Sequence, residues 1–162
     1  MVPNIEMDMK ETTLGYIEYD GCYLMLYRDK KENDLNKMKW VGVGGHLEEG
    51  ETPDECFIRE VREETGIILT EDKIVRRGVV DFVSDIYENE RMFLYTATVE
   101  SSEFSECDEG TLKWIKKDEV LDLNLWEGDK YFLKPLIAEE MDIELTLTYE
   151  GENLVSCVGK IQ

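Results

Sequence analysis

The sequence predicts one α+β or α/β domain, in which mixed β-strands surround a single strong helix. Its length of 162 residues is about one domain's worth of protein. Hydrophobic residues make up 42% of the chain, which is enough for a buried core. Short runs rich in Leu, Val, Thr and aromatic residues alternate with turn signals, and only one segment has complete helix start and stop signals. We therefore expect residues 1–162 to form a single domain.

The first strands are predicted at residues 12–19 and 22–28. Both runs are rich in Tyr, Leu and Thr, and the Asp-Gly pair between them is a strong signal for a β-hairpin. Residues 29–38 are polar throughout, which indicates a solvated loop. A short strand is expected at 40–43, just before two glycines that let the backbone turn sharply or approach a ligand closely.

The strongest element is a helix predicted from Pro53 to Thr65. Thr52 is expected to cap it, Pro53 suits its first position, and Glu55 completes a capping box. Gly66 suits the left-handed residue that ends a helix. The apolar stripe of this helix, which should face the core, consists of Phe57, Ile58 and Val61.

The second half of the chain adds strands and one weaker helix. Three strands are predicted at 73–85, 91–100 and 111–116. Residues 127–141 have a helical apolar pattern, which Pro135 should kink or break. A closing hairpin is expected from strands at about 143–149 and 154–161.

Charge and composition exclude several classes of protein. The chain has 18 Lys and Arg against 38 Asp and Glu, so its net charge of -20 would repel a nucleic-acid polymer. Its one histidine, His46, excludes a multi-histidine zinc site. No run approaches the ~18 apolar residues of a membrane helix, and residues 1–13 lack the apolar stretch of a signal peptide. The four cysteines lack metal or redox spacing and are expected to be reduced. We expect a cytoplasmic protein without a membrane partner.

Three glutamates on the predicted helix are candidate ligands for a metal ion. At about 100° per residue, Glu60, Glu63 and Glu64 share one helix face, away from the apolar stripe. Like charges at this spacing repel each other by roughly 0.2–0.5 kcal/mol per pair. A divalent cation such as Mg²⁺ or Mn²⁺ would turn this repulsion into a net attraction to the metal. Substrate phosphates commonly complete the coordination of such a cation. The alternative is a solvated helix face in an acidic chain.

The segment from Gly45 to Ile67 resembles the Nudix box, G-x5-E-x7-R-E-U-x-E-E-x-G-U, where U is a bulky aliphatic residue. The specified positions are filled by Gly45, Glu51, Arg59, Glu60, Val61, Glu63, Glu64, Gly66 and Ile67. The resemblance implies a Nudix fold, a mixed sheet sandwiched between helices in three layers. It also implies hydrolysis of a nucleoside diphosphate linked to another moiety.

The resemblance also implies roles for individual residues. The implied ligands of Mg²⁺, with Mn²⁺ possible, are Glu60, Glu63, Glu64 and the backbone carbonyl of Gly44. Arg59 would hold the loop and the helix together, partly through Glu51. A metal would neutralise phosphate charge and acidify a water, whose proton a carboxylate must remove. The candidate general bases are Glu63 and Glu109, the latter on a later loop; Glu109 could instead be a solvated loop acid.

Similarity over roughly residues 12–160 extends to the MutT-like subgroup, which includes oxidised purine nucleoside triphosphatases. It implies that Trp126 stacks on a purine, that Asp129 hydrogen-bonds its edge and that Phe82 lines the pocket; the aromatic residues could instead be ordinary core residues. Two positions depart from that subgroup: Val41 stands where a relative has a purine-contacting asparagine, and Gly128 where it has an aspartate. Selectivity for an oxidised base depends on such polar contacts.

Two basic side chains are candidates for contacting phosphate. His46 directly follows the two glycines, and Arg28 ends the second predicted strand. Either could instead be an exposed surface residue.

These observations predict a Mg²⁺-dependent hydrolase of MutT type. It would cleave a nucleoside triphosphate, with oxidised purine triphosphates among the candidates, to the monophosphate and pyrophosphate. One alternative is a Nudix hydrolase of another diphosphate, such as a nucleotide sugar or a dinucleotide. Another is a non-catalytic nucleotide- or metal-binding module, against which the intact motif argues. The oligomeric state stays open.

Overall fold

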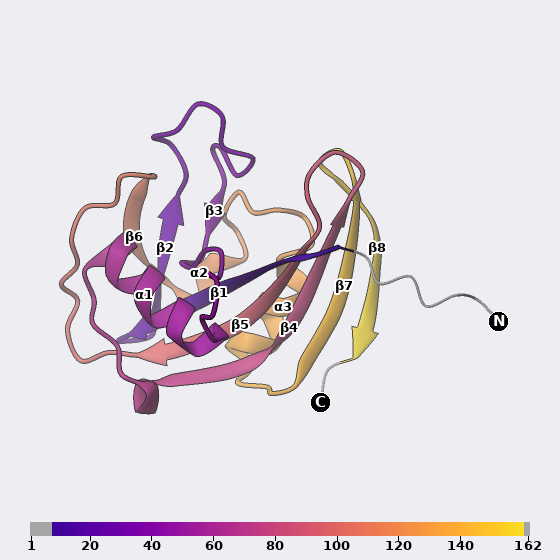
Figure 1. Ribbon diagram of the computed structural model, residues 1–162. Helices are drawn as coiled ribbons and strands as arrows, with labels where there is room; N and C mark the ends of the chain where they lie inside the picture. The colour runs from indigo at the N-terminus through magenta and orange to yellow at the C-terminus, as the bar shows by residue number, and fades with distance from the viewer. Residues whose placement is uncertain (1–7, 161–162) are drawn as a thin grey trace.

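One mixed β-sheet of eight strands organises residues 8–160, the part of the chain described by this computed structural model (Figure 1). The strands are β1 (Lys10–Tyr19), β2 (Cys22–Tyr27), β3 (Trp40–Val41), β4 (Ile74–Ser84), β5 (Glu90–Thr98), β6 (Thr111–Lys116), β7 (Ile143–Glu150) and β8 (Asn153–Lys160). Their order is β3-β2-β1-β5-β4-β7-β8, and β6 pairs with β2. The pairs β1–β5 and β4–β7 are parallel, whereas the others are antiparallel.

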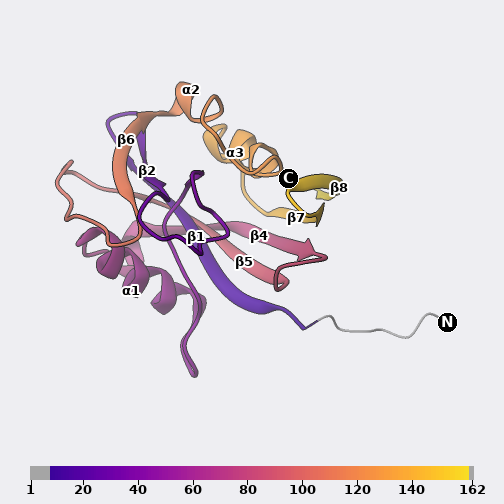
Figure 2. The same cartoon turned by 90° about the horizontal axis from the view of Figure 1, so that it is seen from above.

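Helices cover both faces of this sheet. They are α1 (Pro53–Thr65), α2 (Lys117–Val120) and α3 (Lys130–Ile137), with a short 3₁₀ helix at Glu71–Lys73. Figure 2 shows α1 on one side of the sheet and both α2 and α3 on the other. Each face has its own buried core: Phe57 and Val61 of α1 belong to one, and Phe132 and Leu133 of α3 belong to the other. This arrangement confirms the predicted mixed sheet between helices.

The helix α1 has the predicted bounds and caps. The backbone N–H of Glu55 donates to Thr52 Oγ1, and the backbone N–H of Thr52 donates to Glu55 Oε1, so the capping box is complete. At the other end, Gly66 adopts a left-handed φ of 77° and its N–H donates to the carbonyl of Arg62. The caps satisfy backbone groups at both ends, so the first and last residues of α1 are set by local chemistry.

The predicted first hairpin forms, but it is paired only beside its turn. Asp20 and Gly21 both have positive φ, as a two-residue hairpin turn requires, yet β1 and β2 pair only at two positions. On its other edge β1 pairs in parallel with β5 along most of its length. Gly15 leaves room for α1, because a Cβ there would lie 2.2 Å from Cε1 of Phe57. The helix α1 therefore packs directly against the backbone of β1.

The C-terminal half differs from the prediction at one helix. The helix α3 is shorter than the predicted segment 127–141 and is not broken at Pro135, which lies inside it and is buried. Pro135 precedes the helix end by only two residues, so little helix remains beyond the hydrogen bond that proline removes. The helix α2 was not predicted; the closing hairpin of β7 and β8 is confirmed.

All four cysteines are free thiols, as expected. Cys56 and Cys107 are buried and act as small apolar core residues. Cys157 is exposed and does not. Among residues 8–160, no helix has the length and apolar character needed to cross a membrane.

Candidate active site

A cavity of about 550 Å³ is lined by β1, the loop after β2, the loop before α1, the C-terminal half of α1, β4, β7 and the segment before α3. The predicted site residues that line it are Arg28, Gly44, His46, Arg59, Glu60, Glu64, Phe82, Glu109, Trp126 and Asp129. Glu51 and Glu63 do not line it. The fold therefore brings acidic residues of α1 and aromatic residues of distant strands and loops to one cavity.

The acidic end of the cavity centres on Glu64. This side chain is buried, and within the described chain no group donates a hydrogen bond to its Oε2. Burial, together with the nearby carboxylates of Glu109 and Glu60, raises the pKa of Glu64 to about 9. A buried carboxylate among like charges is stabilised by a proton or by a cation. The orphaned oxygen thus fits a ligand of a divalent metal.

Arg59 ties the loop before α1 to the helix. Its guanidinium donates two hydrogen bonds to Glu51, from Nε at 2.7 Å and from Nη2 at 2.9 Å, and this pairing lowers the pKa of Glu51 to about 2. Nη2 also donates to the carbonyl of His46. Nη1 donates to Glu60 Oε1 at 2.8 Å and to Glu63 Oε2 at 3.1 Å. Arg59 and Glu51 therefore have the contacts of orienting residues.

The carboxylates of Glu60, Glu63 and Glu64 do not meet at one point in the structure. Within the part of the chain that the structure describes, no three His, Cys, Asp or Glu side chains form a group that could already hold a metal ion. Arg59 accounts for this, because it binds the carboxylates of Glu60 and Glu63. Glu63 is also half exposed, whereas Glu64 points into the protein. Glu60 and Glu64 are accordingly the α1 residues best placed to hold a metal beside the cavity.

The two glycines before α1 let this loop pack closely against β1 and against α1. Gly44 has a φ of 151°, and a Cβ there would lie 2.0 Å from the carbonyl oxygen of Thr13. A Cβ on Gly45 would lie 2.5 Å from the carboxyl carbon of Glu60. Side chains at either position would therefore push this loop away from β1 or from α1.

Glu109 lies at the acidic end, held by two cations. Arg28 Nη1 donates to Glu109 Oε2 at 2.9 Å, and Lys31 Nζ lies 3.3 Å from Glu109 Oε1. Arg28 Nε also donates to Asp34 Oδ2. The predicted phosphate contact Arg28 is thus engaged with two carboxylates, and Glu109 belongs to the cavity wall rather than to a solvated loop.

The opposite end of the cavity is apolar and aromatic. Trp126 is buried, and its ring makes edge contacts with Phe82 at 5.9 Å and Tyr149 at 5.2 Å between centroids. Lys39 Nζ lies over the indole, 5.2 Å from its centroid. Asp129 is buried beside them as the residue before α3. An aromatic surface with one buried acid suits a flat heterocycle that carries hydrogen-bonding groups.

Val41 and Gly128, the two departures noted in the sequence, lie in the cavity wall and beside it. Val41 is buried and lines the cavity, where it offers no hydrogen bond. Gly128 N donates to Tyr149 Oη at 2.6 Å, and a Cβ at Gly128 would lie 2.6 Å from that same oxygen. Tyr149 therefore fills the space that a side chain at position 128 would need.

The segment 29–38 corrects the sequence prediction of a solvated loop. Asp34, Leu35 and Asn36 line the cavity, and the side chain of Asp34 is only 5% exposed. Asn36 Oδ1 accepts a hydrogen bond from Trp126 Nε1 at 2.7 Å. Polar residues between two strands carry no local signal of burial, so sequence reasoning missed this wall. It also missed Tyr149, whose alternation in β7 predicts burial but not a place in a site.

Asp129 makes a pH dependence of stability testable. Burial raises its pKa to about 7, although the positive charge of Lys39 opposes this. Between about pH 4 and pH 7 the folded protein keeps a proton that the unfolded chain has lost, so the free energy of unfolding should fall as pH rises, by up to about 1.4 kcal/mol per pH unit. Urea unfolding across this range should show a smaller fall in Asp129→Asn. Equal slopes in both proteins would contradict the pKa assignment.

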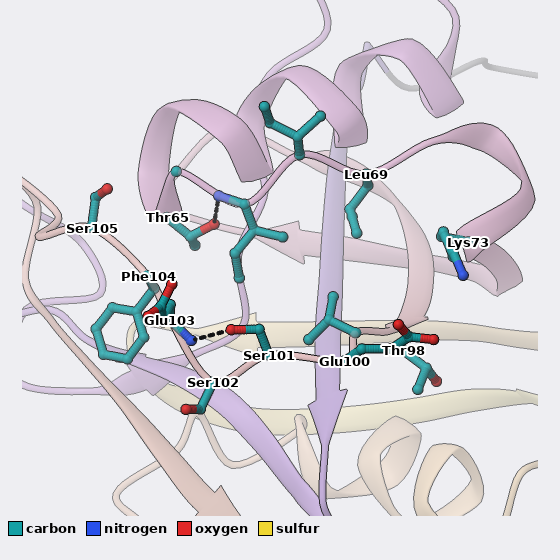
Figure 3. A pocket seen from close by; sticks show the side chains of 14 residues that line it. Thr65, Leu69, Lys73, Thr98, Glu100, Ser101, Ser102, Glu103, Phe104 and Ser105 are labelled. Atoms are coloured by element: carbon teal, nitrogen blue, oxygen red, sulfur yellow. Dashed lines mark hydrogen bonds between the residues drawn. The ribbon is translucent and has the colours of Figure 1, made fainter.

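A second hollow, of about 940 Å³, is larger but contains none of the predicted site residues. Figure 3 shows its lining from the end of α1 and the loop after β5, with Thr65, Leu69, Phe104 and Ser105 among the side chains drawn. Its side chains are mainly small hydroxyl and aliphatic groups. The smaller cavity, with its perturbed acids, is therefore the candidate active site.

Comparisons with known proteins agree with the motif and the fold. The NUDIX domain family matches residues 17–136. YvcI of Bacillus subtilis, an uncharacterised Nudix hydrolase, is 31% identical over 118 residues, which are 70% of this chain and 73% of that protein. The oxidised purine nucleoside triphosphate hydrolase of Danio rerio is 28% identical over 127 residues, 77% of this chain and 79% of that protein.

A solved structure extends the likeness to almost the whole chain. The crystal structure of a mutator MutT protein from Bacillus halodurans has a TM-score of 0.80 and 28% sequence identity, and the match covers 93% of this chain and 97% of that one. Together with the family match over residues 17–136, this likeness establishes the relationship that the box predicted. The chain belongs to the Nudix hydrolase family and is similar to its MutT proteins.

Proposed function

We propose that this Nudix hydrolase is a Mg²⁺-dependent pyrophosphohydrolase of MutT type that cleaves a nucleoside triphosphate to the monophosphate and pyrophosphate. Oxidised purine triphosphates are among the candidate substrates, as the name of the Danio rerio relative suggests. The observation that carries the proposal is the cavity itself. The orphaned carboxylate of Glu64 lies at one end of it, and Trp126 and Asp129 lie at the other.

The acidic end would hold the metal. Its ligands would be the carboxylates of Glu60 and Glu64, together with Glu63 once Arg59 releases it and the carbonyl of Gly44. All are oxygen donors, which Mg²⁺ and Mn²⁺ prefer. Bound there, Mg²⁺ would neutralise phosphate charge and acidify a water molecule.

The remaining residues at this end would orient the substrate and accept a proton. Glu109 is our candidate for the general base, because it lines the cavity beside Glu64 whereas Glu63 does not. Arg59 and Glu51 would hold the loop before α1 against the helix. His46, an exposed residue of the cavity lining, and Arg28 beside Glu109 would contact the phosphates.

The aromatic end would bind the base. Trp126 would provide a stacking surface, Phe82 would line the pocket and Asp129 would hydrogen-bond the edge of a purine. The substrate would be a small nucleotide and not a nucleic-acid polymer, given the net charge of -20. We further propose a single catalytic domain that works in the cytoplasm without a membrane partner.

One assay tests this proposal. Purified protein is incubated with purine and pyrimidine nucleoside triphosphates, oxidised guanine triphosphate, a nucleotide sugar and a dinucleotide, with and without Mg²⁺, and the products are separated. We expect Mg²⁺-dependent release of pyrophosphate and monophosphate, fastest for purines. Hydrolysis of only the nucleotide sugar or the dinucleotide would assign a different substrate. Undiminished triphosphate turnover in excess chelator would contradict the metal requirement.

A further inference from the structure

Asn36 makes a contact whose chemistry fixes the orientation of its side chain. Its amide meets Trp126 Nε1 at 2.7 Å. The indole nitrogen can only donate, so the atom of Asn36 that faces it must be the carbonyl oxygen, Oδ1. The amide nitrogen, Nδ2, donates no hydrogen bond to any residue between 8 and 160. Asn36 therefore brings two unused N–H donors to the wall of the cavity.

The position of Asn36 is also held from behind. Its backbone N–H donates to Asp34 Oδ1 at 2.9 Å, and Asp34 Oδ2 accepts a hydrogen bond from Arg28 Nε. The side chain of Asp34 is 5% exposed, so this anchor is shielded from water. Asn36 is thus placed by contacts on both sides rather than left on a free loop.

The cavity wall around the base site lacks other neutral amide donors at this end. The side chain of Val41 cannot hydrogen-bond, and Tyr149 Oη, which accepts the N–H of Gly128, adds only the donor of its own hydroxyl. Asp129 contributes a carboxyl group, which as a carboxylate only accepts. Side-chain contacts to a bound base would accordingly come from two amide donors on Asn36, the hydroxyl of Tyr149 and acceptors on Asp129.

Building on the proposed function, we infer that Asn36 is a specificity-determining residue that favours purines with a carbonyl at C6 over purines with an amine there. Guanine presents acceptors at O6 and N7, which match amide donors, and N–H groups at N1 and N2, which match a carboxylate. Adenine presents an amine at C6. If adenine bound in the same way, its amine would face the N–H groups of Asn36. Two donors would then meet without an acceptor in a site that excludes water, and leaving both unpaired costs binding free energy.

The test compares base preference in Asn36→Asp with that of the wild-type protein. Asp keeps an oxygen acceptor toward Trp126 Nε1 and replaces the two donors by a second acceptor. Asn33→Asp is the matched control, because it makes the same change in the same loop at an exposed position outside the cavity. Two quantities are measured for each protein: kcat/KM for GTP and ATP, and Kd for GMP and AMP by isothermal titration calorimetry. The monophosphates probe the base site without chemistry.

We expect the wild-type protein and Asn33→Asp to prefer guanine by about ten-fold or more in both quantities, and Asn36→Asp to lose or invert that preference. Asn36→Ala, which removes the donors without adding charge, should lose the preference without inverting it. Circular dichroism melting checks that each variant is folded.

Two outcomes would overturn the inference, and they differ in what they say of the proposed function. Turnover of triphosphates with a base preference that is unchanged in both Asn36 variants would refute the role of Asn36 and leave the proposed function standing. A wild-type protein that neither hydrolyses GTP or ATP nor binds the monophosphates would refute both.

Discussion

Replacing Glu109 by glutamine is expected to lower kcat by a factor of about 10² or more, with a smaller change in KM. Glutamine keeps the volume of the side chain and its hydrogen bond from Arg28, but it cannot take a proton from an attacking water. Steady-state hydrolysis of a purine triphosphate at saturating Mg²⁺ measures the effect. A thermal melt shows whether losing the charge between Arg28 and Lys31 has disturbed the fold.

Glu63→Gln is the comparison that assigns the base. Glu63 is half exposed, lies outside the cavity and already shares Arg59 with three other carboxylates. We expect its replacement to cost less than that of Glu109. If Glu63→Gln instead loses the larger factor while Glu109→Gln keeps near-normal turnover, Glu63 is the base, and Glu109 serves only to hold Arg28.

Replacing Trp126 by alanine should lower kcat/KM for purine triphosphates by about 1–3 kcal/mol, or roughly 5- to 150-fold. The indole lines the cavity with Phe82 and Tyr149 and offers the largest flat surface to a base. Its loss also leaves Asn36 Oδ1 without a donor. Measuring kcat/KM for purine and pyrimidine triphosphates separates a base effect from a general one.

The buried position of Trp126 makes a structural control necessary. Removing so large a core side chain costs about 3–5 kcal/mol of stability, so assays must run well below the melting temperature. Trp126→Phe keeps an aromatic face and should lose less activity. Trp114→Ala removes a tryptophan of β6 that contacts Tyr19 and Phe104 outside the cavity. Equal losses in Trp114→Ala and Trp126→Ala would place the base elsewhere.

The helix α1 shows why part of this protein could be predicted from its sequence. The start, end and buried face of α1 depend on residues within a few positions of one another: the capping box at Thr52, the left-handed Gly66 and the stripe that includes Phe57. The same holds for the turn between β1 and β2. The acidic positions of the box are likewise local, so the motif located the acidic end of the cavity.

The base end of the cavity could be predicted only in part, because its walls are assembled over long distances. Resemblance supplied Trp126, Asp129 and Phe82, whereas nothing local indicated Asn36, whose partner Trp126 lies 90 positions further along the chain. Pro135 illustrates the opposite error. Proline does remove a helical hydrogen bond, but α3 ends two residues after Pro135, so the helix is not broken there.

The parallel pairing of β1 with β5 has a consequence for how the chain acquires its structure. Lys10 pairs with Glu90 and Glu18 with Thr98, so every contact of this ladder joins residues 80 positions apart. Closing so long a loop costs entropy before the ladder compensates for it, and domains dominated by non-local pairing fold slowly. During synthesis β1 must wait for β5 to leave the ribosome, while its apolar residues Tyr16 and Ile17 lack their native cover. The first strand made therefore lacks its longest partner until β5 has been synthesised, and during this interval its exposed apolar residues favour aggregation.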